Sequence, residues 1–161
     1  MDDDAARAIG ARLAEIYEGI WAGPMQDVPI CNDALGVAAV GFRAHGDAAI
    51  GIVVTPWFMN LIVVEEKAKG GMGQTVPAAV PAGDVDCVTG WLEGFGALCA
   101  CSLFSPMFQF AQMAVAVDVA EAAMTAFFTP PPREERAAPA QSLDRRALLK
   151  GRLVRDAEPL S

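Results

Sequence analysis

Histidine is almost missing from this 161-residue chain, which carries a single one, His45. Catalytic triads and many zinc sites depend on imidazole, and one histidine next to Gly46 in an expected turn is typical of a surface residue. Most acidic side chains lie in expected loops or on helix surfaces, where paired-carboxylate catalysis and metal coordination are not favoured. We therefore predict that the chain is not an enzyme and has no catalytic residue, metal site or cofactor.

Basic residues are also scarce, because 12 lysines and arginines stand against 20 aspartates and glutamates and the formal net charge is −8. Phosphate backbones repel such a body, so nucleic acid is not an expected partner. The charge is uneven: residues 1–129 hold 15 acidic and 5 basic side chains, whereas residues 130–161 hold 5 acidic and 7 basic ones. This pattern is typical of a solvated surface. The acidic residues 1–129 would also attract basic segments, either the chain's own tail or a segment of a partner.

Signals for export and membrane insertion are lacking too. The aspartates at 2–4 are the opposite of the basic start of a secretory signal. The uncharged stretches 48–64 and 94–117 are interrupted by Pro56 and Pro106, so neither offers roughly 20 apolar residues in one helix. We expect a cytoplasmic protein with no membrane span and with reduced thiols at all four cysteines, which are Cys31, Cys87, Cys99 and Cys101.

Hydrophobic residues make up 53% of the chain, enough for a sizeable core. Helical spacing of apolar residues predicts a first helix that ends at Gly23 and Pro24. A second helix is expected to begin at Ser105–Pro106, or near Ala111, and to reach about Phe128.

Between the two helices the apolar runs have the period of strands. A hairpin is expected over residues 37–54, with further strands at 61–65, 75–80 and 87–92. The sequence thus predicts an α+β fold: a small, mostly antiparallel sheet packed by an N-terminal helix and by a long helix after the sheet, with a C-terminal tail.

The domain organisation follows from a change in composition after residue 129. Residues 1–129 are predicted to form a single α+β domain. Residues 130–141 are rich in proline, alanine and charge and have no apolar period, which is typical of a linker. We therefore interpret residues 130–161 as a linker followed by a basic amphipathic tail.

Cys99 and Cys101 form a Cys-x-Cys pair, which is neither the Cys-x-x-Cys of redox proteins nor half of a zinc site with a matching second half. In a strand both sulfurs would share one face. Packed core thiols are the ordinary interpretation. An alternative function stays open, a small cysteine-based redox or metal-handling protein that works through these two thiols and Cys31.

Two segments combine proline, methionine and aromatic residues: residues 55–61, the first motif, and residues 101–110, the second motif. Aromatic side chains give large contact area, and methionine adapts to varied apolar partners. Such segments suit a groove that grips a hydrophobic peptide or an unfinished protein surface, although plain core filling is an equal alternative. The candidate client-binding residues are Pro56, Trp57, Phe58, Met59, Asn60, Leu103, Phe104, Pro106, Met107 and Phe108.

The chain resembles the HybE-type [NiFe]-hydrogenase assembly chaperones. The resemblance runs through residues 28–32, 39–42, 55–61, 101–108 and 145–151, in that order, and is strongest in the two motifs. It implies a private chaperone for one hydrogenase. Its partners would be the large-subunit precursor, the small-subunit precursor with its twin-arginine signal peptide, or both, held until the metal centres are in place. Weak self-association is compatible with the sequence.

A basic tail segment is similar to the twin-arginine export motif, but charged residues follow it where an export signal needs an apolar region. Its residues are Arg145, Arg146, Leu148, Leu149 and Lys150. An amphipathic tail helix is the ordinary interpretation. Our hypothesis is that the tail docks weakly on the acidic body and occupies the surface that receives a client signal peptide.

Overall fold

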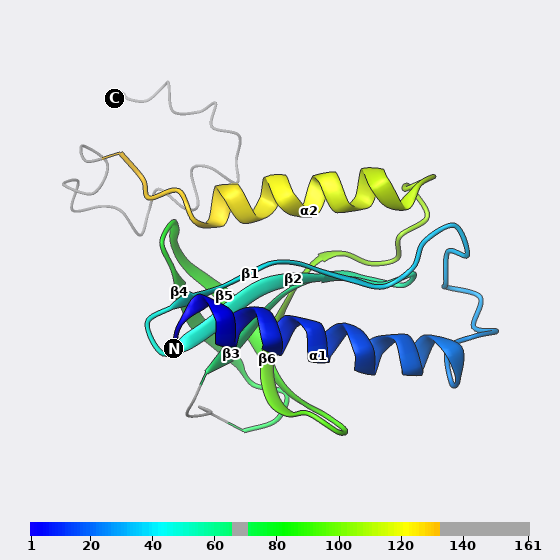
Figure 1. The fold of residues 1–161 in the computed structure, drawn as a ribbon, viewed down its shortest axis with the longest axis horizontal. Coiled ribbons are helices and arrows are strands. Elements are labelled where there is room, and N and C mark those ends of the chain that lie inside the picture. Colours follow the sequence, from blue (N-terminus) through cyan, green and yellow to red (C-terminus); the bar gives the residue numbers. More distant parts are fainter. Residues whose placement is uncertain (66–70, 133–161) are drawn as a thin grey trace. The chain divides into compact units, whose positions relative to one another are not determined.

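The computed structural model describes residues 1–65 and 71–132, and Met1–Thr129 forms one compact unit. Helix α1 spans Asp3–Ala22 (Figure 1). The Asp2 carboxylate accepts a hydrogen bond from the Ala5 N–H at 2.8 Å and so caps the first turn. The helix buries Ala6, Leu13 and Tyr17 along one face, because their spacing returns to the same side with each turn.

Six antiparallel strands form one sheet in the order β1-β2-β3-β6-β5-β4. Each half of the sheet is a meander of three consecutive strands, and the two halves join where β3 pairs with β6. The strands are β1 Ala38–His45, β2 Ala48–Val54, β3 Met59–Glu65, β4 Thr75–Val80, β5 Gly83–Leu92 and β6 Gly96–Phe104.

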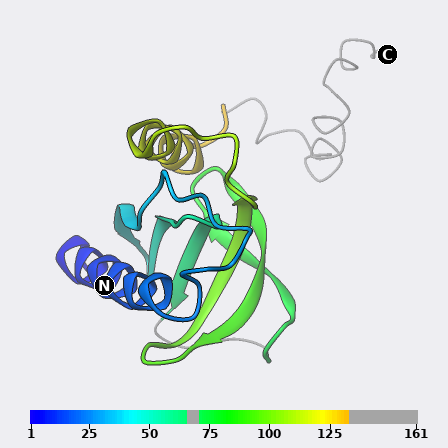
Figure 2. The ribbon, with the colours of Figure 1, turned by 90° about the vertical axis from the view of Figure 1, so that its right-hand side faces the viewer.

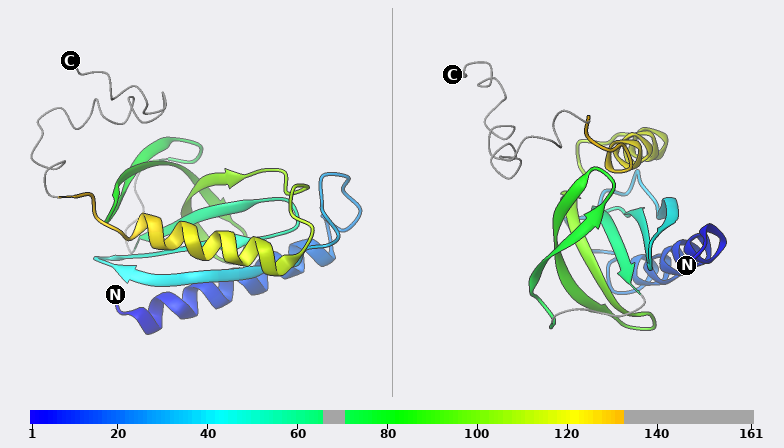
Figure 3. Two further views of the ribbon diagram at one scale, coloured as in Figure 1. Left: turned by 90° about the horizontal axis from the view of Figure 1, so that it is seen from above. Right: turned by 90° about the vertical axis from the view of Figure 1, so that its left-hand side faces the viewer.

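The two helices pack on opposite faces of the first meander (Figure 2). Along β2, Ile50 and Ile52 point into the core with helix α2, which spans Met113–Phe127, whereas Ala49 and Val53 point into the core with α1. The β4–β5 turn reaches the end of α2, where the Ala82 N–H donates to the Phe127 carbonyl at 2.9 Å (Figure 3). The sheet is therefore buried on both faces where the helices cover it.

Phe42 fills the contact between α1 and the sheet. A Cβ atom added at Gly10 of α1 would lie 2.6 Å from the Phe42 ring, and one added at Gly51 of β2 would lie 2.2 Å from it. Both positions therefore need glycine, because any larger side chain would overlap the ring.

The predicted α+β fold is confirmed, including an antiparallel sheet between an N-terminal helix and a helix after the sheet. Strand β6 was not predicted, because its small and mixed residues show no clear period of two. Of the two expected helix starts, Ser105–Pro106 is wrong and the one near Ala111 is close, since α2 begins at Met113 and ends at Phe127. The described residues, 1–65 and 71–132, include no helix with the length and apolar character needed to cross a membrane.

Candidate functional site

The two motifs lie side by side in the sheet. The first motif forms the β2–β3 turn and enters β3, and the second contains the end of β6. Register pairs Met59 with Phe104 and Leu61 with Cys101. Two segments 40 or more residues apart in the sequence therefore meet at one end of the sheet, as the interpretation of a shared site requires.

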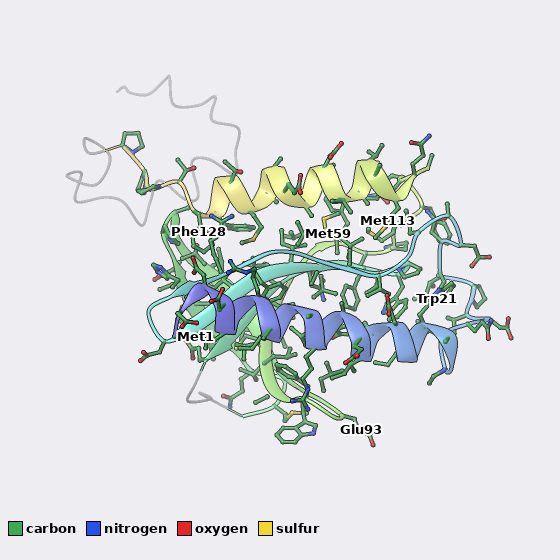
Figure 4. All side chains as sticks on the ribbon, viewed as in Figure 1. Met1, Trp21, Met59, Glu93, Met113 and Phe128 are labelled. Atoms are coloured by element: carbon green, nitrogen blue, oxygen red, sulfur yellow. The ribbon has the colours of Figure 1, made fainter. Side chains whose placement is uncertain are left out.

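A single residue, Asn32, ties both motifs to the loop after α1, the first through its backbone and the second through its side chain. The Asn32 N–H donates to the Pro56 carbonyl at 2.8 Å, and the Asn32 side-chain amide donates to the carbonyls of Met107 at 3.0 Å and Phe110 at 2.7 Å. The Gly36 N–H also lies 3.5 Å from the Met113 sulfur. Figure 4 shows Trp21 and Met113 at this end of the unit, with Met1 and Phe128 at the other.

Half of the candidate client-binding residues are turned inward. Pro56, Met59 and Met107 are fully buried, and Leu103 and Phe104 pack against the core on the α2 side. Phe104 also meets Phe110 edge to face, with ring centroids 5.1 Å apart. In this conformation the three fully buried residues cannot touch a partner, and their contacts support the site from within.

Other residues at the same end are exposed. Phe108 is 56% exposed, and Pro106 beside it is also exposed. Ile30, at 46%, and Val115 were not among the candidates, since nothing in the local pattern separates them from other aliphatic residues. They belong to segments that Asn32 and Gly36 hold together. We call Ile30, Pro106, Phe108 and Val115 the apolar rim.

Four half-buried or buried aromatic rings extend this end toward α1. Trp57 and Phe58 from the first motif lie 6.4 Å and 5.3 Å from the Tyr17 ring, and Trp57 lies 6.3 Å from Trp21. The Thr55 hydroxyl accepts hydrogen bonds from the N–H groups of both Trp57 and Phe58, which fixes the turn. The rings are therefore held in place before any partner arrives.

The last candidate, Asn60, lies on β3 with its side-chain oxygen buried and with no hydrogen-bond donor among the described residues. A buried acceptor without a donor is uncommon, because it loses water and gains nothing in exchange. Because the atom is buried, a partner cannot contact it in this conformation.

The thiols are not arranged for chemistry. Burial raises the pKa of Cys87 to about 12, with further contributions from Cys101 and Cys99, and burial also raises the pKa values of Cys99 and Cys101 themselves. Thiolate is the nucleophilic and metal-binding form, so these groups are poor at both tasks near neutral pH. In the parts of the chain that the structure describes, no group of three or more His, Cys, Asp or Glu side chains could hold a metal ion.

The tail motif with Arg145, Arg146, Leu148, Leu149 and Lys150 lies outside the described residues. The hypothesis that the tail docks on the acidic body therefore stays a prediction, as does the domain boundary after residue 129.

Comparison with known proteins gives consistent matches. The profile of a family described as "[NiFe]-hydrogenase assembly, chaperone, HybE" matches residues 8–151. The chain is 45% identical over 157 residues to the hydrogenase expression/formation protein HupJ of Bradyrhizobium diazoefficiens, covering 94% of this chain and 93% of that protein. It is 33% identical over 164 residues to protein HoxT of Cupriavidus necator, covering 92% and 91%.

The fold is also similar to a solved structure. The solution structure of HybE from Escherichia coli superposes with a TM-score of 0.60, covering 76% of this chain and 78% of that one. Sequence identity across this superposition is 18%, so the likeness concerns the fold. The profile match includes the whole sheet, both motifs and α2.

Proposed function

Because this chain belongs to the HybE family of [NiFe]-hydrogenase assembly chaperones, we propose that it is a dedicated chaperone that binds immature hydrogenase subunits before their export. The clients are the large-subunit precursor, the small-subunit precursor with its twin-arginine signal peptide, or both. Cytoplasmic localisation goes with this proposal, since the chaperone must meet its clients before they leave the cytoplasm.

The observation that carries the proposal is the apolar rim. Phe108 is a large ring that is more than half exposed, on a loop held from beneath by Asn32. Exposed apolar side chains on segments that hydrogen bonds hold together are typical of a protein-binding surface. Rigid placement lowers the conformational entropy that binding would otherwise cost. The rim therefore suits an apolar segment of an incompletely folded subunit.

The test measures binding of the full-length chain to each purified precursor separately. We expect Phe108→Ala to weaken binding of the true client at least tenfold, as for a central aromatic contact. Val88→Ala is the matched control, because Val88 is also exposed and apolar but lies on β5, outside the rim. The proposal fails if neither precursor binds the wild-type chain, or if both variants bind as tightly as wild type.

The cysteine-based alternative has no observation in its favour. The raised pKa values of the thiols argue against it. Replacing Cys99 and Cys101 together with serine is expected to leave client binding intact with some loss of stability. Loss of binding without loss of folding would revive the alternative.

A further inference from the structure

A pocket lies at the other end of the sheet from the apolar rim, where β3 and β5 end and β6 begins. It has a volume of about 210 Å³. Pockets for small organic ligands usually measure roughly 300–1,000 Å³, so this one is the size for one or two side chains of a polypeptide. Its lining includes Val63, Glu65, Met72, Thr89, Trp91 and Cys99.

Register builds the pocket from neighbouring strands. Cys99 pairs with Val63 on one side and with Thr89 on the other, and Trp91 pairs with Ala97 two residues further along. Side chains two residues apart in a strand share a face. Trp91 therefore lies on the same face as the row of Val63, Cys99 and Thr89, two residues beyond Thr89 along β5. The floor therefore combines the apolar Val63 and Cys99 side chains with Thr89, and the indole forms part of the edge.

Met72 completes the edge from the segment before β4. The Gly73 N–H donates to the Thr89 carbonyl at 2.8 Å, and the Thr89 N–H donates to the Gln74 carbonyl at 2.9 Å. The Thr89 hydroxyl also donates to the Gly71 carbonyl. These bonds hold residues 71–74 along β5, so the edge is a built part of the fold.

Two exposed apolar side chains and one carboxylate meet at this edge. Trp91 is 66% exposed and Met72 is 67% exposed. Glu65 is half-buried, and the one salt bridge among the described residues joins Arg7 to Asp4 elsewhere. The carboxylate therefore has no cationic partner within residues 1–65 and 71–132.

A carboxylate that has no cationic partner among the described residues and lies beside an exposed indole suits a side chain with an apolar stem and a cationic tip. Arginine and lysine have this form, and they bury their stems while the charged head stays at the surface. Guanidinium groups also lie over tryptophan rings and bind carboxylates through paired N–H groups. Anionic ligands would be repelled by Glu65 and by the acidic body.

We propose that this pocket binds an arginine side chain of a partner polypeptide, with its stem against Trp91 and Met72 and its guanidinium at Glu65. The site is separated from the apolar rim by the length of β3. It deepens the proposed function and rests on it, because the twin-arginine signal peptide named among the clients is such a partner polypeptide.

The experiment follows the indole N–H resonance of Trp91 in the ¹⁵N NMR spectrum of the full-length chain, assigned by its loss in Trp91→Phe. The probe is a blocked peptide with two arginines between leucines. The comparison peptide carries citrulline in place of arginine, which keeps the shape and removes the charge. We expect the arginine peptide to shift the Trp91 resonance in a saturable way and the citrulline peptide to bind about tenfold more weakly.

Variants separate this site from its surroundings. Glu65→Gln is expected to weaken binding about threefold to fivefold, the range for a partly exposed ion pair. Glu93→Gln is the matched control, because Glu93 is an exposed carboxylate on the β5–β6 turn outside the pocket. Phe108→Ala should leave peptide binding unchanged, so failure here and failure at the rim are distinguishable. Bound peptide should also slow alkylation of Cys99, which lines the pocket.

Three results would overturn the proposal. One is a Trp91 resonance that does not respond to the arginine peptide, or responds equally to the citrulline peptide. Another is a shift that depends on protein concentration without peptide, which would make a second copy of the chain the occupant. The third is a peptide-free shift caused by Arg145→Gln with Arg146→Gln, which would assign the pocket to the chain's own tail.

Discussion

The side-chain amide of Asn32 donates a hydrogen bond of 2.7 Å to the carbonyl oxygen of Phe110, 78 residues away in the sequence. The same amide reaches the carbonyl of Met107. These two bonds hold the loop that precedes α2, which begins at Met113. Phe108 lies in this loop between the two bonded residues and is exposed.

We expect Asn32→Ala to lower the free energy of unfolding by about 1–3 kcal/mol, since it removes the two hydrogen bonds that the Asn32 amide donates to partly buried carbonyls. Asn60→Ala is the matched control: the Asn60 side-chain oxygen makes no hydrogen bond among the described residues, so its loss should be smaller. Urea unfolding followed by circular dichroism measures both. Equal losses for the two variants would contradict the role given to Asn32.

Gly51→Ala should lower the free energy of unfolding by about 1–3 kcal/mol, because the new Cβ atom would lie 2.2 Å from the Phe42 ring. Phe42→Leu removes the ring and is expected to rescue part of this loss. The double variant should therefore be less destabilised than the sum of the single variants. Additive losses in thermal or urea unfolding would show that the contact does not set the need for glycine.

Alanine substitutions at two neighbouring residues of the second motif should change the free energy of unfolding by very different amounts. Met107→Ala is expected to lower the free energy of unfolding by about 2–5 kcal/mol, because Met107 is fully buried. Phe108→Ala should change it by no more than about 0.5 kcal/mol, as is usual for exposed positions. Urea unfolding tests the pair. A large loss for Phe108→Ala would mean that the ring packs in the domain and is not free for a client.

The ionisation of Cys87 should make the protein less stable at high pH. Its pKa in the folded chain is raised from 9.0 to about 12, chiefly by burial. Between these values the unfolded thiol loses its proton while the folded thiol keeps it, so the free energy of unfolding falls as pH rises through this window. In Cys87→Ala the free energy of unfolding should fall less steeply above pH 9 than in wild type. Near neutral pH the two pH profiles should run parallel. Unfolding curves from pH 7 to 11 measure this, and profiles that stay parallel throughout would contradict it.

Local pattern was sufficient for several elements. The helical spacing of Leu13 and Tyr17 predicted α1, and turn-forming Gly46 between two β-type runs predicted the first hairpin. Strand β6 was not predicted from the sequence. Residues 96–104 lie half-buried almost throughout, so no alternation of apolar and polar residues marks them. The helix start expected near Ala111 lies within two residues of Met113, whereas the alternative at Ser105–Pro106 lies in a loop that Asn32, far away in the sequence, holds by hydrogen bonds.

The sequence by itself determined the acidic body, the α+β fold and the two motifs that carry the family resemblance, because charge, period and residue type are local properties. Only the tertiary structure decided which motif residues face outward: Met107 is buried and Phe108 is exposed although they are adjacent. The tertiary structure also added Ile30, which lies two residues before Asn32, to the apolar rim. It placed Trp91 and Glu65 in the lining of one pocket. Burial and neighbourhood depend on contacts between distant segments, and local pattern does not contain them.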